Sequence, residues 1–134
     1  MARRLTVAGS MFGLDHESIE ANEFRKATFN GEKILSNDQP QNLIDMEWGW
    51  GGECRLELDL DAYLLDNQDI RVVGTAKLYE GASEESGDLD GQRDFIVIIP
   101  RGKSAYHSQR VKNDREGGDY ADYKLTFHNS LAGG

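Results

Sequence analysis

Two runs of alternating residues, CRLELDLDAYL at positions 54–64 and IRVVGTAKLY at positions 70–79, decide the fold. Apolar and polar side chains alternate in both runs, which is typical of a β-strand with one face in a core and the other in water. The residues between them, at positions 65–69, are rich in Asp and Asn, which tolerate turn geometry. The stretch therefore predicts an antiparallel hairpin with a five-residue loop.

The register of this hairpin follows from its apolar faces. A slip of one residue would turn the apolar side chains of one strand toward water. Pairing Leu64 with Ile70 brings the two apolar faces to the same side of the sheet. The same register sets Glu57 opposite Lys77 on the outer face, where opposite charges stabilise the pair. We therefore expect this register.

A third strand is expected at the run FIVII, positions 95–99, which is followed by Pro100. The run is short, apolar throughout and rich in β-branched residues. It fits a strand that is covered on both faces better than it fits a helix. A hairpin with one solvent-exposed face, beside a strand that is covered on both faces, indicates two packed layers.

Short strands and turn signals continue on both sides of this stretch. Asn30-Gly31 accepts the positive φ angles of a tight turn, so we expect a hairpin there. Residues 9–22 read as a loop with a helical turn beginning at Asp15. About eight short strands are typical of an all-β fold, a single antiparallel β-sandwich that is C2-like or jelly-roll-like in general plan. The remaining strands are expected at residues 5–8, 24–29, 32–35, 43–48, 105–112 and 120–128.

Length and charge restrict the possible partners. The 134 residues predict one domain, residues 1–134, with room for a core. The chain has 15 basic and 24 acidic residues and a net charge of −9, which argues against nucleic acid and anionic membrane as main partners. No stretch has the length of a membrane span, and no signal peptide is evident. We therefore expect a cytoplasmic protein, with unconventional export as the open alternative.

Acidic loops are expected to meet at one end of the sandwich, because each strand crosses it once. That end collects the connections at residues 48–52, 80–94 and 113–119. Like charges crowded on neighbouring loops repel one another unless a cation lies between them. Ca²⁺ binds many oxygen ligands from flexible loops, so the crowding predicts a calcium site. The candidate ligands are Glu80, Asp88, Asp90, Asp114 and Asp119.

The alternative is that these loops are solvated connections without a metal. The segment DLDG at residues 88–91 matches part of a calcium-binding loop, but the later ligands of an EF-hand are missing at their required spacing. A sandwich with acidic loops resembles C2-type calcium-binding domains in general plan. No C2 motif covers any stretch of this sequence, so we assign no family.

Trp48 and Trp50 are candidates for binding a sugar, because flat rings offer apolar faces and nearby carboxylates accept hydrogen bonds. The alternative is that both rings close the open end of the core, since alternation places them on one face of a strand. The single cysteine, Cys54, excludes an intrachain disulfide and is expected as a small buried side chain. No zinc-ligand spacing, nucleophile elbow or phosphate loop appears in the sequence.

These features favour a non-enzymatic binding module. We expect Ca²⁺ at the acidic end and a protein or a glycan as partner. The alternative is a metal-free acidic interaction protein, such as an inhibitor or immunity-type partner of a basic protein, in which charge speeds association. An enzyme has no positive support from any motif.

Overall fold

The computed structural model describes residues 2–16, 21–114 and 118–133. These residues form eight antiparallel strands in two four-stranded sheets and contain no helix, hence none long and apolar enough to cross a membrane. The all-β prediction is confirmed. The strands are β1 (Arg3–Asp15), β2 (Glu23–Leu35), β3 (Gln41–Trp50), β4 (Cys54–Leu64), β5 (Ile70–Glu80), β6 (Leu89–Ile99), β7 (Ser104–Lys112) and β8 (Tyr120–Leu131).

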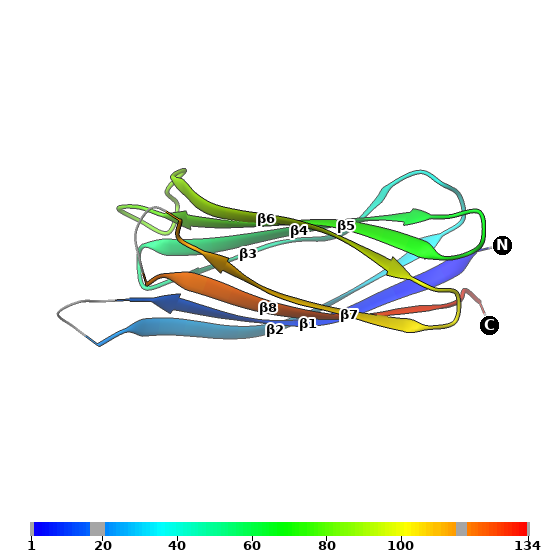
Figure 1. The fold of residues 1–134 in the computed structure, drawn as a ribbon, viewed down its shortest axis with the longest axis horizontal. Helices are drawn as coiled ribbons and strands as arrows, with labels where there is room; N and C mark the ends of the chain where they lie inside the picture. The colour runs from blue at the N-terminus through cyan, green and yellow to red at the C-terminus, as the bar shows by residue number, and fades with distance from the viewer. Residues whose placement is uncertain (1, 17–20, 115–117, 134) are drawn as a thin grey trace.

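The two sheets lie as two layers, one above the other in Figure 1. Sheet A has the order β2-β1-β8-β7, and sheet B has the order β3-β4-β5-β6. Both chain termini lie at one end of the layers, at the right of Figure 1. The opposite end, at the left, carries the β3–β4, β5–β6 and β7–β8 connections, and we call it the acidic end.

The β4–β5 hairpin has the predicted register. Leu64 pairs with Ile70, and Glu57 pairs with Lys77 across the outer face. The alternating side chains of β4 face inward and are buried, so the core begins from this strand. Each buried leucine stabilises the fold by about 1.5–3 kcal/mol relative to an exposed one. Tyr123 of β8 is buried in the opposite sheet, and its ring packs against Phe95 of β6 with centroids 5.8 Å apart.

Strand β1 is longer than predicted. The sequence indicated a strand at residues 5–8 and then a loop, but β1 continues to Asp15. Glycines that seemed to interrupt the pattern make room for aromatic rings. The ring of Phe29 lies against Gly9, and the ring of Trp50 lies against Gly13, where a Cβ atom would come within 2.6 Å of Trp50 Cε2. Most of the expected helical turn, residues 17–20, lies outside the described residues.

The predicted hairpin at Asn30-Gly31 is wrong. Strand β2 runs straight through both residues, and Gly31 pairs with Val7 of β1. Gly31 is not among the glycines with positive φ. A Cβ atom at Gly31 would lie 2.8 Å from Ile44 Cδ1 of the opposite sheet. The glycine therefore serves close packing between the layers and forms no turn.

Strand β6 is covered on one face only, which corrects the prediction for residues 95–99. Phe95 and Ile99 face the core, whereas Ile96 is 57% exposed and Ile98 is 44% exposed. The continuous apolar run suggested burial on both faces, but β6 is the edge strand of sheet B. No third layer covers the outer face of that sheet among the described residues.

Candidate functional site

The acidic end is held together by backbone hydrogen bonds between its connections. The amide of Gly81 donates to the carbonyl of Glu53 over 3.1 Å, which joins the β5–β6 connection to the β3–β4 turn. The amide of Asp114 donates to the carbonyl of Asp90 over 2.7 Å, which joins the β7–β8 connection to β6. The acidic connections therefore lie at one end of the sheets, as the alternation of strands predicted.

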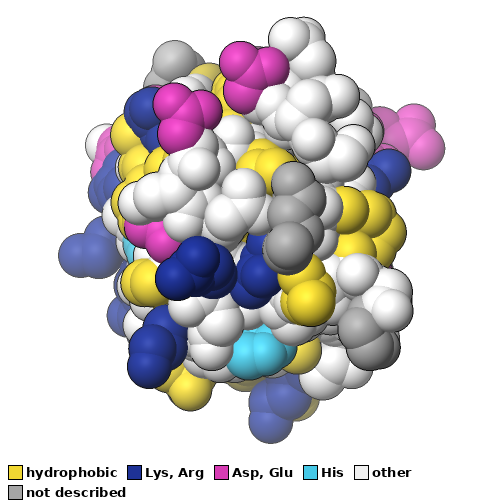
Figure 2. Space-filling model, turned by 90° about the vertical axis from the view of Figure 1, so that its right-hand side faces the viewer, with side chains coloured by type: hydrophobic (Ala, Val, Ile, Leu, Met, Phe, Trp, Pro, Cys, Tyr) yellow, Lys and Arg dark blue, Asp and Glu magenta, His cyan; other side chains and the backbone are white. Residues whose placement is uncertain are grey.

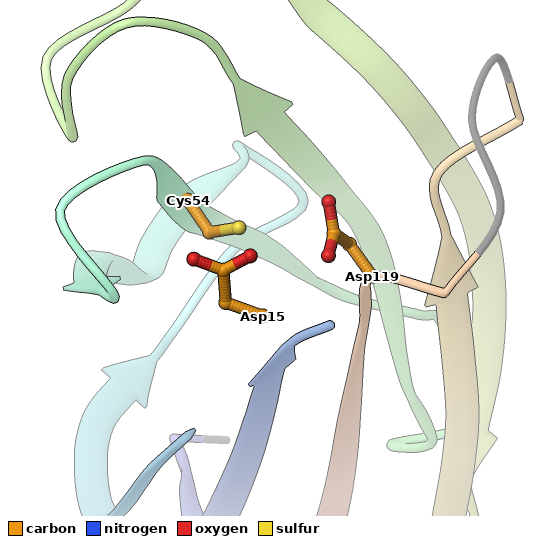
Figure 3. Close-up of side chains that lie close together, drawn as sticks. All are labelled: Asp15, Cys54 and Asp119. Atoms are coloured by element: carbon orange, nitrogen blue, oxygen red, sulfur yellow. The ribbon is translucent and has the colours of Figure 1, made fainter. Parts of the chain in front are cut away.

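Two carboxylates and the thiol form a buried cluster at this end. Asp15 ends β1, Cys54 begins β4, and Asp119 lies directly before β8. Their ligand atoms all lie within 4.8 Å of one another. Figure 3 shows the three side chains directed toward one another from these separate elements. All three residues are buried.

A second cluster shares Asp15 and consists of carboxylates only. Asp15, Glu53 and Glu80 bring one carboxylate oxygen each within 4.8 Å of the others. Asp15 is buried, Glu80 is half-buried and Glu53 is exposed, so this cluster leads from the core to the surface. The side-chain amide of Asn113 donates a hydrogen bond to Glu80 Oε2 and orients that carboxylate.

The electrostatic potential in this region is negative. Burial, and after it the carboxylates of Asp119, Asp15 and Glu80, raise the pKa of the Cys54 thiol far above its ordinary value. Asp119 Oδ1 accepts a hydrogen bond of 2.8 Å from the backbone amide of His16, which orients this carboxylate. A cation placed among these groups would lower the free energy of the buried charges.

The β5–β6 connection forms a strap over the β3–β4 turn. The amide of Gly52 donates to Glu84 Oε2 over 2.8 Å, and Arg55 Nη1 donates to the carbonyl of Glu84 over 2.9 Å. Gly51, with φ +66°, lies against the side chain of Asp15, where any Cβ atom would collide with the carboxylate. The turn therefore closes directly over Asp15, and the position of that side chain is fixed before any ligand arrives.

The structure separates the five predicted ligands. Glu80 and Asp119 take part in the clusters, but in different ones. Among the described residues, Asp88, Asp90 and Asp114 belong to neither cluster. Asp114 lies 3.5 Å from Arg93 in an ion pair, and Asp88 is exposed.

Sequence reasoning missed Asp15, Glu53 and Cys54 as members of a site. Asp15 was read as the start of a helical turn, and Cys54 as a plain core residue. The available signal was the pair of glycines at 51 and 52, which allows a tight turn beside the end of another strand.

The two tryptophans are core residues, which corrects their assignment to sugar binding. Trp48 packs against Phe29 with ring centroids 5.0 Å apart, and Trp50 packs over Gly13. Both rings are buried, so neither offers a face to a ligand in solution. The alternative interpretation, in which both rings close the core, agrees with this placement.

A comparison with models of protein families finds no match for this chain, and a comparison with curated proteins finds none either. The assignment of the candidate site therefore depends on the geometry and chemistry of its residues.

Proposed function

We propose that this protein is a non-enzymatic binding module whose acidic end binds a divalent cation, Ca²⁺, through Asp15, Glu53 and Glu80. The observation that carries the proposal is the convergence of three carboxylates from three separate elements within 4.8 Å. Oxygen ligands suit Ca²⁺, and the exposed side of the cluster leaves room for water and for an oxygen from a partner. A C2-like general plan, predicted from the sequence, is compatible with this function.

The neighbouring thiol makes Zn²⁺ the metal to compare. Cys54 and Asp119 share Asp15 with the carboxylate cluster, so one cation near Asp15 excludes a second. Thiolate ligands favour Zn²⁺, whereas Ca²⁺ takes oxygen ligands. The raised pKa of Cys54 means that Zn²⁺ must displace a firmly held proton.

Thermal unfolding with Ca²⁺, with Zn²⁺ and with EDTA tests the proposal. A cation that binds only the folded chain stabilises it by about 2.7 kcal/mol at 100 times its Kd, which raises the midpoint by several degrees. We expect Glu53→Gln to remove the Ca²⁺ response. Glu85→Gln removes one charge from an exposed side chain of the strap and is the matched control.

An unchanged midpoint of the wild-type chain in millimolar Ca²⁺ would contradict the calcium proposal. A response to Zn²⁺ that disappears in Cys54→Ser would move the cation to the buried cluster instead. Calcium binding that survives Glu53→Gln would show that the ligands are other carboxylates of the acidic end.

A metal-free acidic interaction protein is the second candidate, and the outer face of sheet B supports it. Asp45 lies directly opposite Asp59, whereas Glu47 and Glu57, also directly opposed, share an ion pair with Arg55. Like charges at opposed positions destabilise a sheet, so a basic partner would relieve a cost that the free chain carries. A charge-reversal variant of Asp59 is expected to slow association with such a partner more than it speeds dissociation.

A further inference from the structure

The outer face of sheet A carries an aromatic row near the acidic end. The rings of Phe12 and Phe24 are stacked with centroids 5.9 Å apart, and those of Phe12 and Tyr120 lie 6.2 Å apart. The three residues come from β1, β2 and β8, and Phe24 is 61% exposed. Phe12 and Tyr120 are half-buried, so Phe24 is the exposed ring of a stacked aromatic cluster across three strands, and such an apolar patch is a candidate binding surface.

Basic side chains border the aromatic row. Arg110 lies 3.8 Å above the ring of Tyr120 and forms two hydrogen bonds with Asp122. Lys26 and Lys124 line a shallow groove beside Phe12. In the end-on view of Figure 2, Lys and Arg side chains predominate in the lower half, on the side of sheet A. Arg110, Lys26 and Lys124 therefore place three basic side chains beside the aromatic row, with the carboxylate of Asp122 among them, although the whole chain has a net charge of −9.

The outer face of sheet B has the opposite character. Ile96 pairs with Val73, and Ile98 pairs with Arg71, so the exposed isoleucines form an apolar corner toward the end that carries the termini. Acidic side chains continue from this corner along β3, β4 and β6 and outnumber the basic Arg55 and Lys77 that lie among them. The acidic residues are Asp45, Glu47, Glu57, Asp59, Asp61 and Asp94.

The outer face of sheet A and the outer face of sheet B are complementary when two copies stack with their long axes antiparallel. In sheet A, the aromatic row lies at the acidic end, Lys26 lies directly opposite Phe12, and Lys124 lies one outward position further toward the other end, opposite Ser10. In sheet B, the apolar corner lies toward the termini, and the acidic residues follow toward the acidic end. Reversal of one copy therefore places apolar groups on apolar groups and lysines on carboxylates.

We propose that the outer face of sheet A of one copy docks on the outer face of sheet B of a second copy. Phe24 and Ile96 are the central anchors, because they are the most exposed apolar side chains of their patches. The contact joins two different faces, so each copy keeps one free face and the association is open-ended. The proposal does not depend on a bound cation.

Sedimentation velocity of the full chain in EDTA tests this arrangement. We expect the average mass of the wild-type protein to rise continuously with concentration. Phe24→Glu disables one face, and Ile96→Glu disables the other, so each variant alone is expected to lose association by about tenfold or more. An equal mixture of the two variants is expected to form dimers and nothing larger, because one intact face remains on each.

Leu131→Glu is the control, because it adds the same charge at an exposed apolar side chain outside both patches. Its association should equal that of the wild type, and circular dichroism should show all three variants folded. A wild-type chain that stays monomeric at every concentration overturns the proposal, even if it binds an acidic peptide or anionic vesicles. A closed dimer, or a variant mixture that stays monomeric, also overturns it.

Discussion

The two ends of the molecule bury polar groups in opposite ways. At the end that carries the termini, Arg3 is 6% exposed and donates from Nε to Asn129 Oδ1 over 2.9 Å. The side-chain amide of Asn129 in turn donates from Nδ2 to the backbone carbonyls of Gln68 and Ile99 over 2.9 and 3.0 Å. One positive charge is thus surrounded by neutral acceptors and donors that are already satisfied.

At the acidic end, the buried cluster of Asp15, Asp119 and Cys54 consists of acids alone. Burial, and after it the two carboxylates, raises the pKa of the Cys54 thiol. Neutral hydrogen-bond partners surround the charge in the first arrangement, whereas acidic groups gather in the second, where we propose a cation. The difference shows that buried polarity alone does not identify a binding site, but buried acids gathered from several strands do suggest one.

The largest expected effect is at the termini end. Asn129→Ala removes the acceptor of Arg3 Nε and the side-chain donor to the carbonyls of Gln68 and Ile99, while the bond from Arg3 Nη2 to the backbone carbonyl of residue 129 remains. We expect the free energy of unfolding to fall by about 3 kcal/mol. Urea denaturation measures the change, and the shift produced by Ca²⁺ should remain as in the wild type. A loss below about 1 kcal/mol would mean that water replaces the amide and that the two ends are less different than proposed.

Alkaline pH is expected to weaken the acidic end through Cys54. The pKa of this thiol is raised in the folded chain. The contribution of the protonated thiol to the free energy of unfolding is therefore complete below the ordinary thiol pKa and is lost as pH rises above it. Above about pH 8.5 the loss in the free energy of unfolding should approach 1.4 kcal/mol for each further pH unit.

The measurement compares wild type with Cys54→Ala in EDTA by urea denaturation at several pH values. The difference between the two curves isolates the thiol, because Tyr123, whose pKa is also raised by burial, is present in both. Parallel curves up to pH 10 would show that neither burial nor the neighbouring carboxylates raise the pKa of the thiol in the folded chain.

The smallest expected effect is a gain in stability. Asp119→Asn keeps Oδ1 as acceptor for the amide of His16 and removes one negative charge from the buried cluster. Without a cation we expect a gain in stability of about 1 kcal/mol. Thermal unfolding in EDTA at pH 8 measures it, with Asp88→Asn at an exposed position as control. A destabilised variant would show that the carboxylate, like Asn129, is already satisfied by its neighbours.

The sequence predicted the parts of the fold that a single strand pair determines. The register of Leu64 with Ile70 follows from alternation alone, because any slip exposes a whole apolar face. Asn30-Gly31 failed as a turn for a different reason. Its glycine is required by Ile44 from the opposite sheet, and a local pattern contains no information about the layer that will face it.

The candidate site shows the same limit. Glu80 and Asp119 were predicted because acidic connections are visible in the sequence. Asp15 was not predicted as a ligand, because its place depends on how far β1 extends, and two glycines concealed that length. Cys54 was predicted to be buried, and it is, but its carboxylate neighbours come from strands distant in sequence.

Two glycines of sheet A also limit how the layers can move. The ring of Trp50 from sheet B occupies the space above Gly13 of sheet A, and Ile44 occupies the space above Gly31. A sliding motion of one layer along the other would drive these side chains into residues that have a Cβ atom. The interlocked layers resist shear, so the spacing between Asp15 and the turn above it is set by the same contacts that keep the layers in register.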